Sequence, residues 1–307
     1  MLRNLIAERC ASRLSRRAAV TRIAGASAAV AVAAGGLDHS FAVGAAGATS
    51  SSTMTTQEGT LMTNTTATDA APVTVVLVHG AFADAAGWSG VIERLQGAGM
   101  VAIAPPNPLR GVVHDSAYIA NFLNQVPGPV LLVGHSYGGV VITNAASKAE
   151  NVVGLVYVAA FAPDEGEGLL QLASDSRDSI LVSALNPYQY PTGSGDETAV
   201  EFLVKPEKYH ETFAADLPEE QTVVMATTQR PIAELAFSEV TGTPAWKTLP
   251  SWAVVATGDK AAGSDIVRSM AERAGATATE VDGSHAIMVS QPKVVADVIL
   301  TAAAAVA

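Results

Sequence analysis

Short runs of apolar, mostly β-branched residues constrain the fold of this chain more than any other feature of its sequence. Runs without a regular alternation of polar residues are typical of strands that are buried on both faces, as in a parallel sheet. The runs are VTVVLV (73–78), MVAIA (100–104), PVLLV (129–133), VVGLVYVAAF (152–161) and WAVVAT (252–257), and a weaker last strand is predicted for ATATEV (276–281).

Segments with the apolar spacing of helices lie between these runs. They are WSGVIERLQGAG, SAYIANFLNQV, VVITNAASKAE and IVRSMAERAGA, and the last is VVADVILTAAAAVA. Strands that alternate with helices are typical of an α/β fold, in which right-handed crossovers place helices against a parallel sheet. We therefore predict an α/β protein with a mostly parallel sheet flanked by helices.

The alternation of strands and helices is interrupted between residues 164 and 248. This stretch contains clustered acidic residues, prolines and scattered aromatic residues, with helical patterns but no clear core strand. The simplest interpretation is a helical cap inserted into the sheet domain. The predicted core then consists of residues 72–163 and 249–307, and the predicted cap of residues 164–248.

The N-terminal residues 1–48 have the features of an export signal. The paired Arg16 and Arg17 precede a weakly apolar run rich in alanine and glycine, which favours the twin-arginine route. Small residues that fit a cleavage site end at Ala42 and at Ala48, and both alternatives stay open. We expect an exported protein, either periplasmic or secreted.

Amino-acid composition predicts a linker after the signal and excludes several kinds of partner and site. Residues 49–71 are rich in serine and threonine without periodicity, which predicts a disordered linker. Acidic side chains outnumber basic ones by 29 to 18, so nucleic acid is not an expected partner. The only cysteine, Cys10, lies in the predicted signal, so we expect no disulfide, thiol nucleophile or cysteine-based zinc site after export. No stable membrane insertion is expected after processing, and the oligomeric state stays open.

The stretch VGHSYGGV (133–140) places a serine between a buried strand and an apolar helix. This is the strand–turn–helix setting of a G-x-S-x-G nucleophile elbow. We expect a strained backbone at Ser136. Gly134 and Gly138 fit this turn because side chains at these positions would collide where the strand and the helix approach each other. The hydroxyl of Ser136 would then lie exposed at the carboxyl edge of the sheet, where α/β folds bind ligands.

A serine nucleophile needs a base, and His285 is the best candidate among the six histidines. It follows the last predicted strand, in VDGSHAIMVSQP, at the same sheet edge as Ser136. It also comes after the serine in the chain, as the order Ser, Asp or Glu, His demands.

The acid of such a triad should follow a strand between these two residues. Asp259 comes directly after WAVVAT and would accept the Nδ1 proton of His285, which fixes the tautomer of the imidazole. Asp164 and Asp265 are the alternatives that the sequence leaves open.

A tetrahedral oxyanion needs two backbone N–H donors. One is expected from Tyr137, which follows the candidate nucleophile. The second is expected from the loop VHGAFADAAGW after the first strand, where Gly80 permits a tight turn. That donor is the amide of Ala81, with Phe82 as the alternative.

The chain resembles the α/β-hydrolase fold superfamily, and within it the small methylesterase and hydroxynitrile-lyase-like branch. The matching stretches are VLVHGAFADAAGW, LLVGHSYGG, LVYVAAFAPDEGE, VVATGDK and GSHAIMVSQP, which span about residues 75–291. The resemblance implies a mixed, mostly parallel sheet, a helical cap and no cofactor, and we predict no metal site. It also implies the same catalytic Asp259 and His285.

Two positions depart from the lyases of that branch. Those enzymes have a threonine after the first-strand histidine and a lysine after the catalytic histidine, where this chain has Gly80 and Ala286. Both differences favour ester hydrolysis over cyanohydrin cleavage. The expected partner is a small or medium neutral carboxylic ester, cleaved through an acyl-enzyme.

The alternatives to this esterase are a cofactor-free haloperoxidase or perhydrolase, a lactone or amide hydrolase, and a non-catalytic binding protein with the same fold. The substrate pocket is expected to be apolar. The residues that flank the triad positions in sequence are its candidate lining: Phe82, Phe161, Met288 and Trp88.

Overall fold

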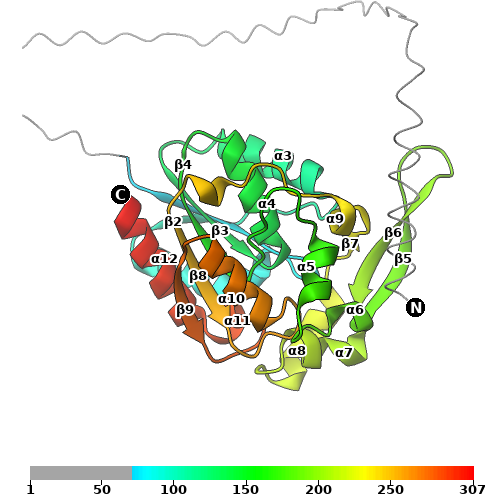
Figure 1. The fold of residues 1–307 in the computed structure, drawn as a ribbon. Coiled ribbons are helices and arrows are strands. Elements are labelled where there is room, and N and C mark those ends of the chain that lie inside the picture. The colour runs from blue at the N-terminus through cyan, green and yellow to red at the C-terminus, as the bar shows by residue number, and fades with distance from the viewer. Residues whose placement is uncertain (1–70) are drawn as a thin grey trace, which may run out of the picture. The chain divides into compact units, whose positions relative to one another are not determined.

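The structure, a computed structural model, describes residues 71–307. Its centre is a six-stranded sheet in the order β2-β1-β3-β4-β8-β9, and every neighbouring pair in it is parallel (Figure 1). The strands are β1 (Thr74–Val78), β2 (Val101–Ile103), β3 (Val130–His135), β4 (Val152–Val158), β8 (Ser251–Ala256) and β9 (Thr277–Val281). All six predicted strands are confirmed to within a few residues.

Helices cover both faces of the sheet, as the alternating pattern predicts. Side chains of α3 (Val112–Leu123), α4 (Tyr137–Ala145) and α10 (Ser264–Arg273) share one hydrophobic core with alternate residues of the strands. Those of α2 (Ser89–Gly97) and α12 (Pro292–Val306) pack in a second core on the opposite face. The two cores explain why the strands carry apolar residues without alternation.

The stretch between β4 and β8 forms the insertion, but it is not purely helical. It contains the helices α5 (Leu169–Asp175), α6 (Leu181–Ala184), α7 (Pro206–Phe213), α8 (Glu219–Thr228) and α9 (Leu235–Ser238). It also contains an antiparallel three-stranded sheet of β5 (Leu185–Pro191), β6 (Thr198–Val204) and β7 (Ile232–Ala233), which corrects the prediction of a helical cap.

The physical reason for this difference lies in β6. Its sequence TAVEFLV buries Phe202 and Val204 against the rest of the protein, while the strand begins at an exposed threonine. One face of the small sheet is therefore apolar and the other half-exposed, which is the pattern of an antiparallel sheet. Proline and tyrosine residues in β5 hide that pattern in the sequence.

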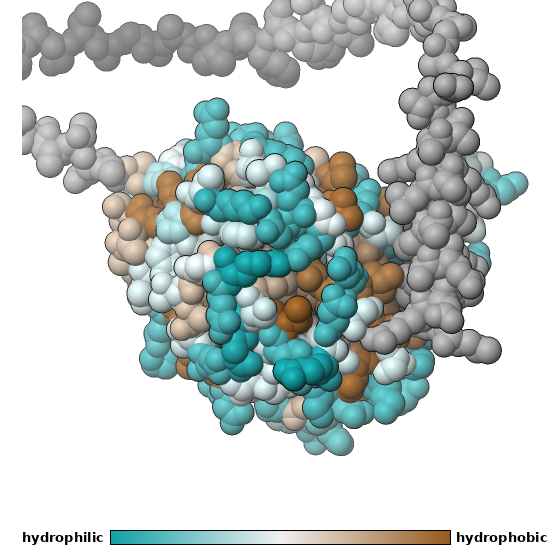
Figure 2. Space-filling model, in the orientation of Figure 1, coloured by the Kyte–Doolittle hydropathy of each residue, from teal (hydrophilic) through white to brown (hydrophobic). Residues whose placement is uncertain are grey.

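The carboxyl ends of the parallel strands position the candidate site. β3 ends at His135, β8 at Ala256 and β9 at Val281, and the candidate catalytic residues follow each of these ends. On the face turned to the viewer in Figure 2, apolar surface appears as patches between polar side chains.

Two sequence predictions concern the N-terminal region. The predicted export signal, and the predicted linker except for its last residue, lie outside the described residues. Within residues 71–307, the helices lack the combination of length and apolar character that crossing a membrane requires.

Candidate active site

Ser136 lies on a sharp turn between β3 and α4. Its backbone has φ 54° and ψ −123°, in a region that non-glycine residues rarely occupy. A Cβ at Gly134 would lie 2.7 Å from backbone atoms of Gly138, and a Cβ at Gly138 would lie 2.4 Å from the carbonyl oxygen of Val78. The glycines thus permit the close approach of strand and helix that the sequence predicts.

The loop after β1 approaches this turn at Gly80. A Cβ at Gly80 would lie 2.6 Å from the Cβ of Ser136 and 2.8 Å from the carbonyl oxygen of His135. Gly80 therefore serves close packing, whereas the tight turn of the loop falls on Phe82, whose φ is 59°. The predicted turn at Gly80 is therefore displaced by two residues, to Phe82.

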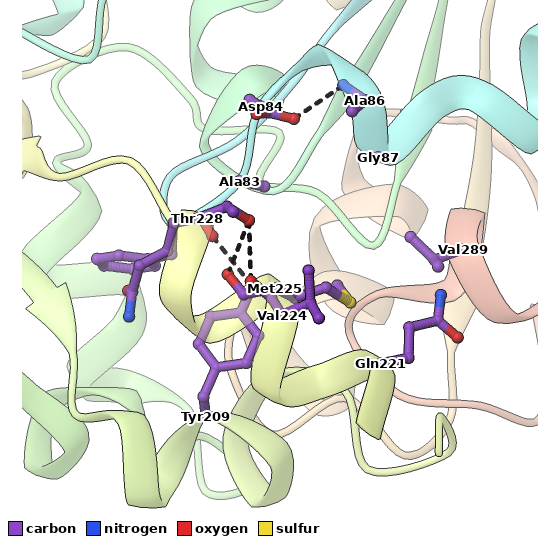
Figure 3. Close-up of a pocket in the computed structure, with 12 residues that line it drawn as sticks. Ala83, Asp84, Ala86, Gly87, Tyr209, Gln221, Val224, Met225, Thr228 and Val289 are labelled. Carbon is purple, nitrogen blue, oxygen red and sulfur yellow. Dashed lines mark hydrogen bonds between the residues drawn. The ribbon is translucent and has the colours of Figure 1, made fainter. Parts of the chain in front are cut away.

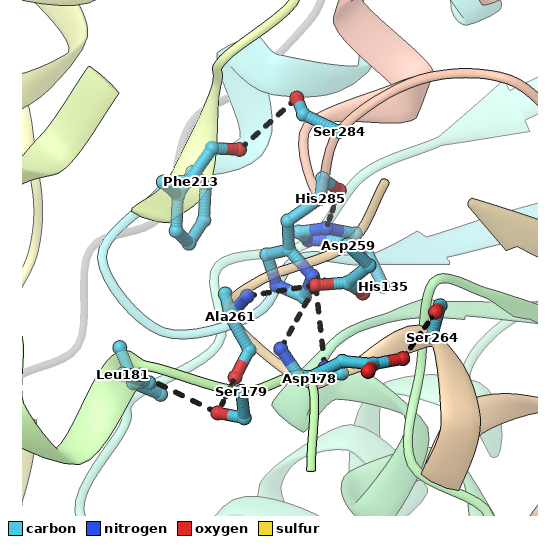
Figure 4. A network of polar contacts seen from close by, with 12 residues as sticks. His135, Asp178, Ser179, Leu181, Phe213, Asp259, Ala261, Ser264, Ser284 and His285 are labelled. Atoms are coloured by element: carbon cyan, nitrogen blue, oxygen red, sulfur yellow. Dashed lines mark hydrogen bonds and ion pairs between the residues drawn. The ribbon is translucent and has the colours of Figure 1, made fainter. Parts of the chain in front are cut away.

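His285 and Asp259 form a buried pair (Figure 4). The Nδ1 of His285 lies 2.8 Å from Oδ2 of Asp259, and both side chains are almost fully buried. The other carboxylate oxygen, Oδ1, accepts hydrogen bonds from the backbone N–H groups of Ala261 at 2.8 Å and Ala262 at 3.0 Å. With its carboxylate held on both oxygens, Asp259 fixes the orientation of the imidazole and favours the tautomer protonated on Nδ1.

The second nitrogen of His285 is unused. Its Nε2 atom is buried and has no hydrogen-bond partner within residues 71–307. The ring of His135, the residue before Ser136, lies against the ring of His285 with centroids 4.7 Å apart. The elbow and the unpaired nitrogen therefore belong to one cluster of side chains.

His135 also holds the backbone of the loop that carries His285. Its Nε2 lies 3.0 Å from the main-chain carbonyl oxygen of His285, to which it donates. Burial, and secondarily the neighbouring His285, lower the pKa of His135 well below its ordinary value. His135 is therefore neutral near pH 7 and adds no charge to the cluster.

The two alternative acids lie elsewhere. Asp164 pairs with Lys247 at 2.5 Å, on the surface of the insertion. Asp265 accepts hydrogen bonds from the hydroxyl of Ser176 at 2.5 Å and the backbone N–H of Arg177 at 2.9 Å. The structure gives neither carboxylate a contact with His285, so it brings together His285 and Asp259 alone among the candidates.

The candidate oxyanion donors differ in availability. The backbone N–H of Phe82 donates to the carbonyl oxygen of Arg230 at 3.1 Å, so it is already used. Within the described part of the chain, the N–H groups of Ala81 and Tyr137 have no acceptor. The N–H of Phe82 is thus occupied, whereas Ala81 and Tyr137 offer a pair of free donors within the described residues.

Two aromatic residues of α7 cover this cluster. The ring of Phe213 meets that of His285 edge-on, with centroids 4.8 Å apart, and the ring of Tyr209 stacks on Phe213 at 5.0 Å. Neither residue is predicted from the sequence as part of the site, where both stand only among the scattered aromatic residues of the insertion. Their spacing of four residues on a helix was the signal that could have paired them.

A cavity of about 470 Å³ lies beside the loop after β1 (Figure 3). The loop residues form one wall and α8 the opposite wall. Its lining is mostly apolar, and Asp84 is its one charged residue; the members are Phe82, Ala83, Asp84, Ala86, Gly87, Tyr209, Gln221, Val224, Met225, Thr228, Gln229 and Val289. Phe82 follows Ala81 and its ring meets that of Phe213, so the cavity adjoins the candidate centre.

Only one of the four predicted pocket residues lines this cavity. Phe82 does, while Trp88 and Met288 are buried in the core that contains α2 and α12, and Phe161 is buried in the other core. Proximity in sequence to a candidate catalytic residue does not decide which way a neighbouring side chain points: Trp88 and Met288 lie on short helical segments that turn these side chains into the core.

Comparisons with known proteins agree with the fold. The profile of the alpha/beta hydrolase family matches residues 75–298. A carbendazim-hydrolysing esterase of Nocardioides sp. (strain SG-4G) is 33% identical over 110 residues, 32% of this chain and 46% of that protein. A pFDCC methylesterase of Arabidopsis thaliana is 28% identical over 189 residues, 55% of this chain and 69% of that protein. The chain thus spans less than half of the first of these relatives.

The crystal structure of polyneuridine aldehyde esterase superposes with a TM-score of 0.65 over 75% of this chain and 99% of that one. The two sequences are 19% identical, so this likeness concerns the fold. The parallel sheet, the serine elbow and the profile match over most of the described residues lead to one conclusion: the chain belongs to the α/β-hydrolase family.

Proposed function

We propose that this protein hydrolyses small or medium neutral carboxylic esters through an acyl-enzyme, with Ser136 as the nucleophile, His285 as the base and Asp259 as the acid. The observation that carries the proposal is the pairing of His285 with Asp259, which leaves a buried, unpaired Nε2 beside the serine elbow. That arrangement is what a general base for a serine hydroxyl requires. The esterases among the relatives support the same reaction class.

The reaction begins with attack of the Ser136 oxygen on the ester carbonyl carbon, while Nε2 of His285 takes the hydroxyl proton. The N–H groups of Ala81 and Tyr137 hold the oxyanion. When the tetrahedral intermediate collapses, the leaving alcohol takes the proton from His285, which gives the acyl-enzyme. A water molecule then attacks the acyl carbon and gives its proton to His285, and Ser136 regains a proton as the acid leaves.

The cavity supports a neutral, partly apolar substrate. Its lining contains no lysine, arginine or histidine that could pair with an anionic group, and Asp84 together with the net charge of −11 would repel one. Val224, one of the lining residues, is 61% exposed, so the cavity opens to solvent at α8. An apolar acyl or alkyl group of the ester fits this wall of valine, methionine and phenylalanine.

The test compares Ser136→Ala with Ser269→Ala, which removes an exposed hydroxyl from α10. A fluorophosphonate probe should label the wild type and Ser269→Ala, and not Ser136→Ala. A panel of p-nitrophenyl esters with acetyl to octanoyl chains should give a burst of p-nitrophenol only where Ser136 is present. Hydrolysis of a lactone and of an anilide is followed alongside, by acid release and by aniline release. Wild-type turnover by Ser136→Ala would refute the assignment.

The same panel separates the alternative functions. Turnover confined to the lactone or the anilide would identify a lactone or amide hydrolase. A wild-type protein that binds esters without labelling would be a non-catalytic binding protein. Halide oxidation in the presence of hydrogen peroxide and acetate would reveal the perhydrolase alternative.

We further propose that residues 1–48 direct export by the twin-arginine route, with the adjacent residues Arg16 and Arg17 as the motif. Residues 1–71 fused to a fluorescent reporter in a bacterial host should carry the reporter out of the cytoplasm. Replacing both arginines by lysine preserves the charge and should retain the reporter inside. Export that persists in the lysine variant would exclude this route.

A further inference from the structure

Phe82, the residue after the candidate oxyanion donor Ala81, is held by hydrogen bonds on both sides of its backbone. Its N–H donates to the carbonyl oxygen of Arg230 at 3.1 Å, and its carbonyl oxygen accepts from the hydroxyl of Tyr209 at 3.0 Å. Both partners come from the insertion, Tyr209 from α7 and Arg230 from the segment after α8. The core itself makes neither contact.

Phe82 needs such support because its backbone is strained. A φ of 59° is unusual for a bulky residue and persists only where the surroundings hold it. The two hydrogen bonds fix the peptide planes 81–82 and 82–83, which follow directly after the plane that carries the N–H of Ala81. The direction of that N–H therefore depends on contacts with the insertion.

Tyr209 is suited to a permanent donor role. Its side chain is buried, with its ring stacked on Phe213, and burial raises the pKa of its hydroxyl far above the ordinary tyrosine value. The hydroxyl therefore stays protonated at neutral pH. Figure 3 shows Tyr209 rising from α7 toward the loop that lines the cavity.

The same helix also holds the loop of the candidate base. The carbonyl oxygen of Phe213 accepts from the backbone N–H of Ala286 at 2.9 Å and from the hydroxyl of Ser284 at 3.4 Å, and its ring packs on His285. Residues 209 and 213 are one helical turn apart. One turn of α7 thus contacts the oxyanion loop and the histidine loop together.

Resting on the proposed function, we infer that Tyr209 is a positioning residue of the oxyanion hole: its hydroxyl holds the strained Phe82 and so directs the Ala81 N–H at the oxyanion. Tyr209 touches neither the reacting atoms nor His285. Tyr209 also lines the cavity, but loss of its hydroxyl leaves the ring in place and removes the hydrogen bond to Phe82. The hydroxyl therefore contributes to the transition state, where the negative charge has developed, and much less to the binding of neutral ester.

The test compares Tyr209→Phe with Tyr157→Phe. Tyr157 is a buried tyrosine of β4 whose hydroxyl shares a hydrogen bond with Thr143 at 2.8 Å, so its variant loses an equivalent buried contact away from the oxyanion loop. Tyr209→Phe should lower kcat for a p-nitrophenyl ester by about 10- to 100-fold with KM close to the wild-type value. Tyr157→Phe should retain kcat even where its melting temperature falls equally.

Two further measurements isolate the oxyanion hole. A phenylboronic acid, which forms a tetrahedral anion on the serine, should bind Tyr209→Phe more weakly by the same factor as kcat falls, and Tyr157→Phe as tightly as the wild type. Backbone hydrogen exchange of the segment 81–88 should accelerate in Tyr209→Phe alone. Unchanged kcat, unchanged boronate affinity or unchanged exchange in Tyr209→Phe would each overturn the inference.

Failure of the proposed function would look different. A wild-type protein that neither turns over esters nor reacts with a fluorophosphonate would refute the esterase, whatever the Tyr209 variant does. A wild type that is labelled and active, with Tyr209→Phe indistinguishable from Tyr157→Phe in any of the three measurements, would refute the role of Tyr209 and leave the esterase standing.

Discussion

Gly80 and Ser136 approach each other so closely that a methyl group on Gly80 would overlap the Cβ of the serine, at 2.6 Å. The same methyl group would also lie 2.8 Å from the carbonyl oxygen of His135. The loop after β1 therefore lies where it does because position 80 has no side chain.

Gly80→Ala tests this relationship. The added methyl group must displace the loop or the elbow, so we expect kcat to fall by at least about 100-fold and the free energy of unfolding to fall by about 1–3 kcal/mol. Gly97→Ala is the control, because nothing lies within 4 Å of a Cβ at that helical position. Ester turnover and urea unfolding measure both effects, and full activity in Gly80→Ala would contradict the expectation.

Asp259→Asn tests the orientation of His285. The asparagine amide would present a donor to Nδ1 and favour the wrong tautomer, so kcat should fall by about 10⁴-fold while the fold is retained. Asp265→Asn and Asp164→Asn change the two alternative acids and should keep activity near the wild-type level. Steady-state kinetics measures kcat of all three variants. A larger loss of kcat in Asp265→Asn or Asp164→Asn than in Asp259→Asn would assign the role of the acid to that residue instead.

Tyr137 and Asp115 form a buried hydrogen-bonded pair under the elbow. The tyrosine hydroxyl donates to Oδ2 of Asp115 at 2.9 Å, and the carboxylate also accepts from the backbone N–H of Arg110 at 3.0 Å. Tyr137→Phe should cost about 1–3 kcal/mol of unfolding free energy, because the buried carboxylate loses a donor. In a double-mutant cycle with Asp115→Asn, the free energies of unfolding measured in urea should show a coupling of about 0.5–3 kcal/mol. Strict additivity of the two single changes would mean that the pair does not interact.

His135 makes stability depend on pH. Burial holds its pKa well below 6.5, so in the native state it stays neutral while the unfolded chain takes up a proton below about pH 6.5. The free energy of unfolding should therefore decrease as the pH falls from 7 to 5.5, by at most about 1.4 kcal/mol per pH unit for this one group. His135→Gln should show a shallower decrease in urea unfolding at the two pH values, and an unchanged slope would exclude His135 as a source. His79, whose pKa is also lowered by burial, adds to the slope in both proteins.

Much of the core could be predicted because its signals are local. A buried strand, a glycine-flanked serine and a helix lie next to each other at 129–145, and the order of Ser136, Asp259 and His285 fixes their places at one sheet edge once the strands are known. The hydrogen bond between His285 and Asp259 then follows from topology.

The insertion could not be predicted in the same way. The contacts of Tyr209 and Phe213 join residues about 130 and 70 positions apart in the chain, and neither residue type carries a chemical signature in sequence. The strain at Phe82 is equally hidden, since a phenylalanine gives no sign of a positive φ. Such features depend on tertiary packing and have no local pattern.

The position of the insertion between β4 and β8 has an evolutionary consequence. The strands before the candidate serine, acid and base are β3, β8 and β9, and they belong to one parallel sheet in which β4 joins β3 to β8. Substitutions and length changes between residues 159 and 250 can therefore reshape the cavity wall at α8 without changing the pairing of these strands. Tyr209, Phe213 and the carbonyl of Arg230 limit this freedom, because they tie the insertion to the oxyanion loop and to the loop of His285. Changes in α8 are therefore tolerated more readily than changes in the turn of α7 that carries Tyr209 and Phe213.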